Sequence, residues 1–250
     1  MPLTPNCGIV NSFHPTASGG PGVSITYKGA LTLKKHIICI GDSNTHGYCA
    51  DPSDCADGAL ARFNEEERWT RRLQTQLGDG YLVVEEGLSG RTTVFDDPLT
   101  EGLSALSMIT PCLKSHEPVS LRILMLGTND TKDRFGCTAA CIGQGMQRLV
   151  RKAQSTDCWG PEGRPNILIV CPPPIDERLK TSEVAPLIGT DCARKSRELP
   201  AVYQTVAELT GCHFFDAKDC EFNQIDYMHL TRKGHAALAD ALTELVRDLT

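Results

Sequence analysis

Short apolar runs separated by longer amphipathic segments extend through most of this 250-residue chain. Leucine and alanine recur at helical spacing between the runs, most clearly over residues 231–249. Strands that alternate with helices pair side by side in parallel. The pattern therefore predicts an α/β fold: a doubly wound, mainly parallel, flavodoxin-like sheet with helices on both faces. The expected strands lie at residues 37–40, 81–84, 121–126, 167–171 and 213–215.

Turn and capping residues place further elements between these strands. Asn64 is a good N-cap for a helix that begins with three glutamates. Pro111 suits the first position of another helix. Helices are also expected over residues 138–154 and through 203–209. The long polar stretch 175–190 is expected to form a lid or a rim.

Composition limits the domain organisation and the partners. Residues 1–33 are rich in glycine, proline, serine and threonine, which indicates an N-terminal extension. Residues 34–250 contain every expected strand, and a hydrophobic content of 40% suffices for the core of one domain. A net charge of −6 with scattered basic residues argues against a nucleic-acid partner. No leader-like or membrane-spanning apolar run is apparent, so we expect a cytoplasmic protein without a membrane partner.

The twelve cysteines suggest either disulfides or a metal site. A disulfide framework is unexpected in a chain with an ample core, and Cys39 and Cys171 fall inside expected strands. A metal site is also unexpected: Cys137 and Cys141 could share a helix face, but no Cys-x-x-Cys pair accompanies them. We therefore expect mostly reduced, structural thiols, with no metal and no cofactor.

Polar residues follow the expected strands at the point where each strand ends. Gly-Asp-Ser after the first strand ends in Ser43, Leu-Ser-Gly-Arg after the second contains Gly90, and Gly-Thr-Asn-Asp after the third contains Asn129. Asp226 and His229 follow the last strand. Because the carboxyl ends of parallel strands meet at one edge of a sheet, these residues should converge there.

These residue types can supply the chemistry of acyl transfer. A serine hydroxyl is a weak nucleophile, so Ser43 needs a base within hydrogen-bond reach, which His229 could provide. Asp226 could accept a hydrogen bond from the other ring nitrogen of that histidine. The backbone N–H groups of Ser43 and Gly90 and the side-chain amide of Asn129 could stabilise a developing oxyanion. Taken alone, each residue could equally be a turn or cap residue. The catalytic interpretation is favoured because all of them occur together, in order, after successive strands.

Other titratable residues near these motifs are expected to have different roles. His46 is too close to Ser43 in the sequence to have an orienting acid, and His235 is expected inside the last helix, so both are weaker candidates for the base. Asp42 and Asp130 are expected to support the site through backbone hydrogen bonds rather than to react.

The ordered set resembles the SGNH, or GDSL-type, serine hydrolase family from about residue 37 to residue 250. The four signature residues correspond to Ser43, Gly90, Asn129 and His229. The segment 48–62, which contains Cys49 and Cys55, departs from the pattern, so no acyl-chain preference is carried over. The chain is most similar to the intracellular arylesterase/acyltransferase subgroup, on the segments Glu67–Trp69, Glu85–Thr93, Asp96–Pro98, Met125–Lys132 and Pro172–Pro174.

The resemblance implies a serine esterase that hydrolyses short-chain or aryl carboxylic esters through an acyl-serine intermediate. Water, or an alcohol in a transfer reaction, would accept the acyl group, and the enzyme would be a homo-oligomer. A carbohydrate O-acetylesterase of the same fold is an alternative, because the catalytic residues do not distinguish the acyl carrier. A ligand-binding flavodoxin-like domain is the non-enzymatic alternative, although the sequence contains neither standard glycine-rich phosphate loop. A scaffold protein that has lost activity is disfavoured, because Ser43, Asp226 and His229 are all present.

Overall fold

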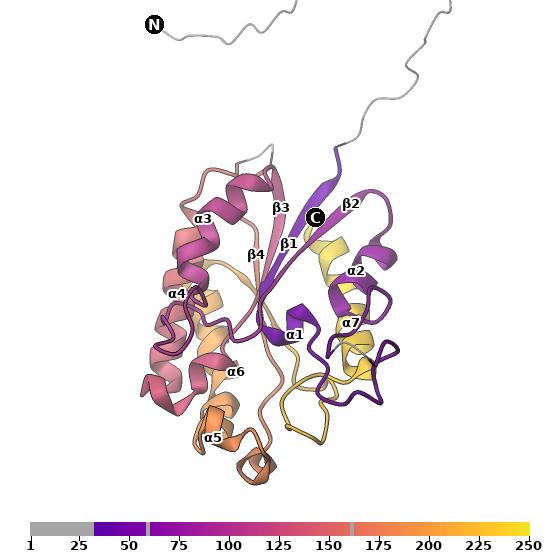
Figure 1. Ribbon diagram of the computed structural model, residues 1–250. Coiled ribbons are helices and arrows are strands. Elements are labelled where there is room, and N and C mark those ends of the chain that lie inside the picture. Colours follow the sequence, from indigo (N-terminus) through magenta and orange to yellow (C-terminus); the bar gives the residue numbers. More distant parts are fainter. Residues whose placement is uncertain (1–32, 59–60, 161–162) are drawn as a thin grey trace, which may run out of the picture. The chain divides into compact units, whose positions relative to one another are not determined.

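Five apolar segments form one parallel sheet in the computed structural model, which describes residues 33–58, 61–160 and 163–250 (Figure 1). Neighbouring strands pair in the order β2-β1-β3-β4-β5, and every pair is parallel. This is the flavodoxin-like strand order, so the predicted fold class is confirmed. The strands are β1 (Lys35–Gly41), β2 (Tyr81–Gly87), β3 (Val119–Met125), β4 (Ile167–Cys171) and β5 (His213–Asp216).

Helices cover both faces of the sheet (Figure 1). Alternate residues of β1 feed two separate cores: Ile37 is buried on one side and Ile38 on the other. Burial on both faces explains why the strands read as continuous apolar runs. One face carries α3 (Ala105–Ser115), α4 (Ala139–Gln154) and α6 (Cys192–Thr210), and the other carries α2 (Trp69–Leu77) and α7 (Arg232–Leu249).

The carboxyl ends of the central strands are level with one another. Gly41 at the end of β1 pairs with Gly87 of β2 and with Met125 of β3. The residues that follow these three strands therefore emerge at one edge of the sheet. Short helical turns lie in the loops that follow the strands: α1 (Ser43–His46), η1 (Asn129–Thr131), η2 (Asp133–Phe135), η3 (Glu177–Thr181) and α5 (Ala185–Ile188).

The helix predicted to start after Asn64 begins later, at Trp69. The carboxylate of Glu67 accepts hydrogen bonds from the backbone N–H groups of Asn64 and Ala56, both at 3.1 Å. These two bonds hold the glutamates in a turn ahead of α2. The predicted cap is present, because Oδ1 of Asn64 accepts from the backbone N–H of Glu66 (3.0 Å). It closes a turn rather than the first turn of the helix, so the predicted helix start was wrong.

Two helices are longer than predicted, and each contains a proline. α3 begins at Ala105, whose N–H donates to the carbonyl of Thr92 (3.1 Å). Its start is therefore fixed by a contact with a preceding loop, and Pro111 lies inside the helix rather than at its first position. A proline there removes one backbone hydrogen bond, and burial of Ile109 and Leu113 against the sheet favours the helix nonetheless.

The polar connection 175–190 packs onto the domain through a small apolar cluster. Ile175 and Leu179 are buried with Cys192 and Met228. The segment also borders the hollow beside Ser43, so it forms a rim there, one of the two forms expected.

The boundary of the predicted N-terminal extension stays a prediction, because residues 1–32 lie outside the described part of the chain. Within the described residues, no helix combines the length and apolar character needed to cross a membrane.

Candidate active site

The serine at the end of β1 is held by a short helix and a close backbone approach. Ser43 is the first residue of α1, and the side chain of Asp42 caps this helix by accepting from the N–H of Asn44 (3.0 Å). A Cβ atom at Gly41 would lie 1.9 Å from the hydroxyl of Thr45 and 2.9 Å from the carbonyl of Met125. Only glycine fits there, which explains the first residue of the Gly-Asp-Ser motif.

A continuous chain of hydrogen bonds joins serine, histidine and aspartate. The Oγ of Ser43 lies 2.7 Å from Nε2 of His229, and Nδ1 of His229 lies 2.6 Å from Oδ2 of Asp226. With Asp226 ionised, Nδ1 carries the proton that it donates to the carboxylate, and Nε2 is left to accept from the serine hydroxyl. All three residues are buried, so these interactions are weakly screened by water.

Asp226 is fixed as an ionised acceptor. Its Oδ1 accepts from the side-chain amide of Asn223 (2.8 Å) and from the backbone N–H groups of Met228 and His229 (3.1 Å each). Burial raises the pKa of Asp226, but the hydrogen bonds and positive charge of His229, together with Asn223, outweigh it and set the pKa at about 2. Tyr227, between Asp226 and His229, has φ of 61°, a left-handed conformation uncommon for a tyrosine.

Gly90 and Asn129 reach the same hollow as the serine. Gly90 has φ of 87°, and a Cβ there would lie 3.1 Å from the side chain of Leu103, so the position suits glycine. Asn129 is the first residue of η1, and its Nδ2 donates to the carbonyl of Arg91 (3.1 Å). This bond fixes the side-chain amide and leaves its second N–H group available to a ligand in the cavity. Ser43, Gly90, Asn129 and His229 all line one cavity of about 200 Å³.

Asp42 and Asp130, the two acids expected to support the site, are both buried. Asp130 is fully buried and accepts from the backbone N–H (2.9 Å) and the hydroxyl (2.5 Å) of Thr93. Burial raises the pKa of Asp130 to about 6, against the lowering effect of the Thr93 hydrogen bonds. Burial likewise raises the pKa of Asp42 to about 6, against the N–H of Asn44.

The two other candidate histidines have different surroundings. His235 is fully buried in α7, where its Nδ1 accepts from the backbone N–H of Trp69 (3.3 Å), and burial lowers its pKa to about 3. Burial and the positive charges of Arg62 and Arg68 lower the pKa of His46. Within the described residues, the histidine that forms a hydrogen bond with the Ser43 hydroxyl is His229, rather than His46 or His235.

Residues that the sequence did not single out complete the site. Asn44, next to the serine, accepts from the N–H of Leu230 (2.9 Å) and so ties α1 to the loop that carries His229. The ring of Tyr48 packs on the imidazole of His229, with 4.6 Å between ring centres. Asn223 was missed although it forms an Asx-turn, in which its Oδ1 accepts from the backbone N–H of Ile225, two residues on (2.8 Å). The same oxygen also accepts from the N–H of Asp226 (2.9 Å).

Comparisons with known proteins agree with this geometry. Residues 39–237 match the family model of the GDSL-like lipase/acylhydrolases. An aryl esterase from M. smegmatis is 38% identical over 86% of this chain and 100% of its own, with a TM-score of 0.77. A carbohydrate acetylesterase from Sinorhizobium meliloti is 34% identical over 87% of this chain and 100% of its own, with a TM-score of 0.74. None of the curated proteins matches the chain.

More distant structures share the fold alone. A lipase/acylhydrolase from Enterococcus faecalis is 17% identical over 86% of this chain and 96% of its own, with a TM-score of 0.58. The family match, by contrast, begins before Ser43, ends after His229 and spans most of the chain. The resemblance inferred from the strand-end motifs is thereby confirmed, and the chain belongs to the GDSL-like lipase/acylhydrolase family of SGNH hydrolases.

Proposed function

We propose that this protein is a serine esterase that hydrolyses small carboxylic esters, with Ser43, His229 and Asp226 as its catalytic residues. The observation that carries the proposal is the unbroken chain of hydrogen bonds, 2.7 Å and 2.6 Å long, from the serine hydroxyl through the imidazole to an ionised carboxylate. A serine in that arrangement has a neutral base in contact with its hydroxyl and an acid that stabilises the imidazolium once it forms.

The mechanism follows from these contacts. The Oγ of Ser43 attacks the ester carbonyl while Nε2 of His229 takes its proton, and Asp226 stabilises the resulting imidazolium. The N–H groups of Ser43 and Gly90 and the free N–H of Asn129 stabilise the oxyanion. When the tetrahedral intermediate collapses, the alcohol departs with the proton from His229. Ser43 is then left as an acyl-serine. A water molecule then attacks the acyl-serine with the same base, and the acid leaves.

The cavity limits the size of the substrate. Its volume of about 200 Å³ is below the range of roughly 300 to 1,000 Å³ that pockets for drug-sized ligands occupy. Val184, Ile188 and Met228 contribute apolar side chains to its lining, whereas Ser89, Thr128 and Lys132 contribute polar groups. We infer a short acyl chain against these apolar side chains, in keeping with the similarity to an aryl esterase. An alcohol that replaced water would give acyl transfer.

A carbohydrate O-acetylesterase is the second candidate. The similarity to an acetylesterase of that class and the polar residues in the lining of the cavity favour it. Comparing kcat/KM for aryl acetates and for acetylated sugars separates the two: a preference of more than about ten-fold for the sugar would make the carbohydrate the substrate class.

Covalent labelling tests the proposed nucleophile. A fluorophosphonate should label the wild-type protein and should fail to label Ser43→Ala, which should keep the fold but lose hydrolysis of aryl acetates. Ser89→Ala, in the lining of the same cavity, is the matched control and should still be labelled. Labelling that persisted in Ser43→Ala would place the nucleophile elsewhere.

The expected cytoplasmic location and homo-oligomeric assembly stay proposals. Light scattering on the purified protein measures the second directly, and a monomer at working concentration would remove it.

A further inference from the structure

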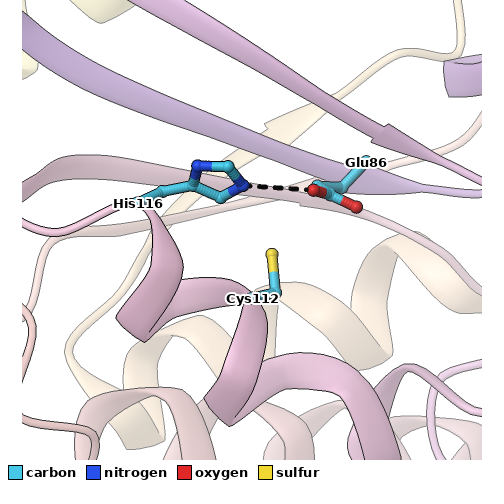
Figure 2. A group of neighbouring side chains, drawn as sticks. All are labelled: Glu86, Cys112 and His116. Carbon is cyan, nitrogen blue, oxygen red and sulfur yellow. Dashed lines mark hydrogen bonds and ion pairs between the residues drawn. The ribbon is translucent and has the colours of Figure 1, made fainter.

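Three potential metal ligands meet on the α3 side of the sheet. They are the carboxylate of Glu86 on β2, the thiol of Cys112 on α3 and the imidazole of His116 at the end of α3. One ligand atom from each lies within 4.8 Å of the other two. Figure 2 shows the imidazole facing the carboxylate, with the thiol directed toward the gap between them. None of the three is among the proposed catalytic residues.

The local structure explains why these residues meet. Cys112 and His116 are four residues apart, so they lie on one side of the last turn of α3. His116 is the C-cap, and its carbonyl is 2.8 Å from Nδ1 of His36 at the start of β1, which holds the end of the helix against the sheet. Glu86 comes from the neighbouring strand β2, which pairs with β1.

We propose that Glu86, Cys112 and His116 bind a zinc ion, with water as the fourth ligand. The Oε1 of Glu86 lies 3.3 Å from Nε2 of His116. Zinc bonds of roughly 2.0 to 2.1 Å at the tetrahedral angle separate an oxygen and a nitrogen ligand by about 3.3 Å. Two of the three ligands therefore stand at the required separation. The sulfur lies within 4.8 Å of both and would have to approach to about 3.4 to 3.6 Å when the metal binds.

The three side chains are buried to different degrees, which leaves one side of the site open to a metal ion. The side chains of Glu86 and His116 are 29% and 30% exposed, whereas Cys112 is only 7% exposed. The thiol thus forms the floor of the site, and the two other ligands form an edge that is open to solvent. An open edge leaves room for the water molecule.

The ligand types select the kind of metal. A thiol and an imidazole beside one carboxylate favour Zn²⁺ and Co²⁺ over Mg²⁺ and Ca²⁺, which prefer oxygen ligands. Arg122, fully buried on β3, lies close enough to Cys112 and Glu86 to interact electrostatically. Its positive charge opposes every cation, so it does not itself distinguish between metals.

The site should act on stability rather than on the reaction. The backbone carbonyl of Glu86 accepts from the guanidinium of Arg91, which also donates to the carbonyl of Gly41 (3.2 Å). A metal on Glu86 would therefore link the end of α3 to the strand ends that precede Ser43 and Gly90. We expect Zn²⁺ to raise the thermal midpoint of the folded protein, because it binds the assembled ligands and not the separated ones.

Cobalt titration tests the site on the full chain after removal of metals with a chelator. Co²⁺ should produce a thiolate-to-cobalt charge-transfer band and the intense visible bands of a tetrahedral ion, and Zn²⁺ should abolish both by displacement. Cys112→Ser should lose the charge-transfer band, and His116→Gln should weaken Co²⁺ binding by at least about ten-fold. The metal-free variants should hydrolyse aryl acetates like the wild type, which shows that they are folded.

Matched controls are Cys141→Ser and His213→Gln, which remove a half-buried thiol and an exposed imidazole elsewhere in the domain. Both should keep the spectrum and the zinc-dependent rise in thermal midpoint. The proposal is overturned if Co²⁺ gives no tetrahedral spectrum, or if the charge-transfer band survives in Cys112→Ser. It is also overturned if Mg²⁺ competes as well as Zn²⁺.

Discussion

Replacing Asn129 by alanine removes two interactions, and their effects can be measured separately. Its Nδ2 donates one N–H to the carbonyl of Arg91 (3.1 Å), and its other N–H is available to an oxyanion in the cavity. Losing the second interaction should cost about 2.7 to 4 kcal/mol in the transition state, so kcat should fall roughly a hundred- to a thousand-fold with KM little changed. Losing the first should cost about 1 to 3 kcal/mol of stability, because a buried carbonyl is left unpaired.

A stability loss of that size leaves the protein folded, since domains typically have about 5 to 15 kcal/mol. The assay is therefore kcat and KM on an aryl acetate, with urea unfolding of the same sample. Asn166→Ala is the matched control, because Asn166 also donates to backbone carbonyls, those of Ser120 (3.0 Å) and Leu249 (2.9 Å), at the opposite end of the strands. It should lose stability and keep its turnover. An Asn129→Ala protein that is destabilised yet fully active would remove Asn129 from the oxyanion site.

Three further predictions concern pH and substrate size. Hydrolysis should increase from acidic to neutral pH, because His229 must be unprotonated whereas Asp226, with a pKa of about 2, stays ionised; a kcat/KM that fell over this range would contradict a neutral histidine base. The pKa of Asp42 is raised by burial from 3.8 to about 6, so its contribution to stability is present below pH 3.8 and is lost as the pH rises through 6. Asp42→Asn should therefore gain stability relative to the wild type between pH 4 and pH 7, by at most about 3 kcal/mol in urea unfolding, and an equal difference at both pH values would refute the shift. Ile188→Ala should raise kcat/KM for butyrate relative to acetate by about ten-fold, and an unchanged ratio would show that the Ile188 side chain does not contact the acyl chain.

The strands and the convergence of the strand-end residues were predictable because their signals are local. A buried strand such as β4 is a continuous apolar run, and residues 167–171 were predicted with the bounds that the structure shows. Parallel pairing then places Ser43, Gly90 and Asn129 at one edge, since the carboxyl ends of such strands are level. Asp226 and His229 belong to one turn, so their contact also follows from their spacing.

What the sequence did not reveal depends on contacts between distant segments. Tyr48 packs on His229 from the loop after α1, and nothing near Tyr48 in the sequence indicates this. Cys112 and His116 have a spacing that suits ligands, yet the third member, Glu86, lies on a different strand. The turn before α2 is likewise tied to a distant segment, since the carboxylate of Glu67 accepts from the backbone N–H of Ala56 in another loop.

The distance along the chain between Ser43 and His229 has a consequence for protein synthesis. Ser43 precedes His229 by almost the whole of the described domain, and all five strands come between them or before them. A chain emerging from the ribosome therefore exposes Ser43 long before His229, and before Leu230, whose N–H donates to Asn44. α7, whose Leu238 and Leu242 cover one side of the sheet, comes after both. The contact between Ser43 and His229 can thus form only after translation has passed the last strand, so a shorter nascent chain cannot carry out the proposed reaction.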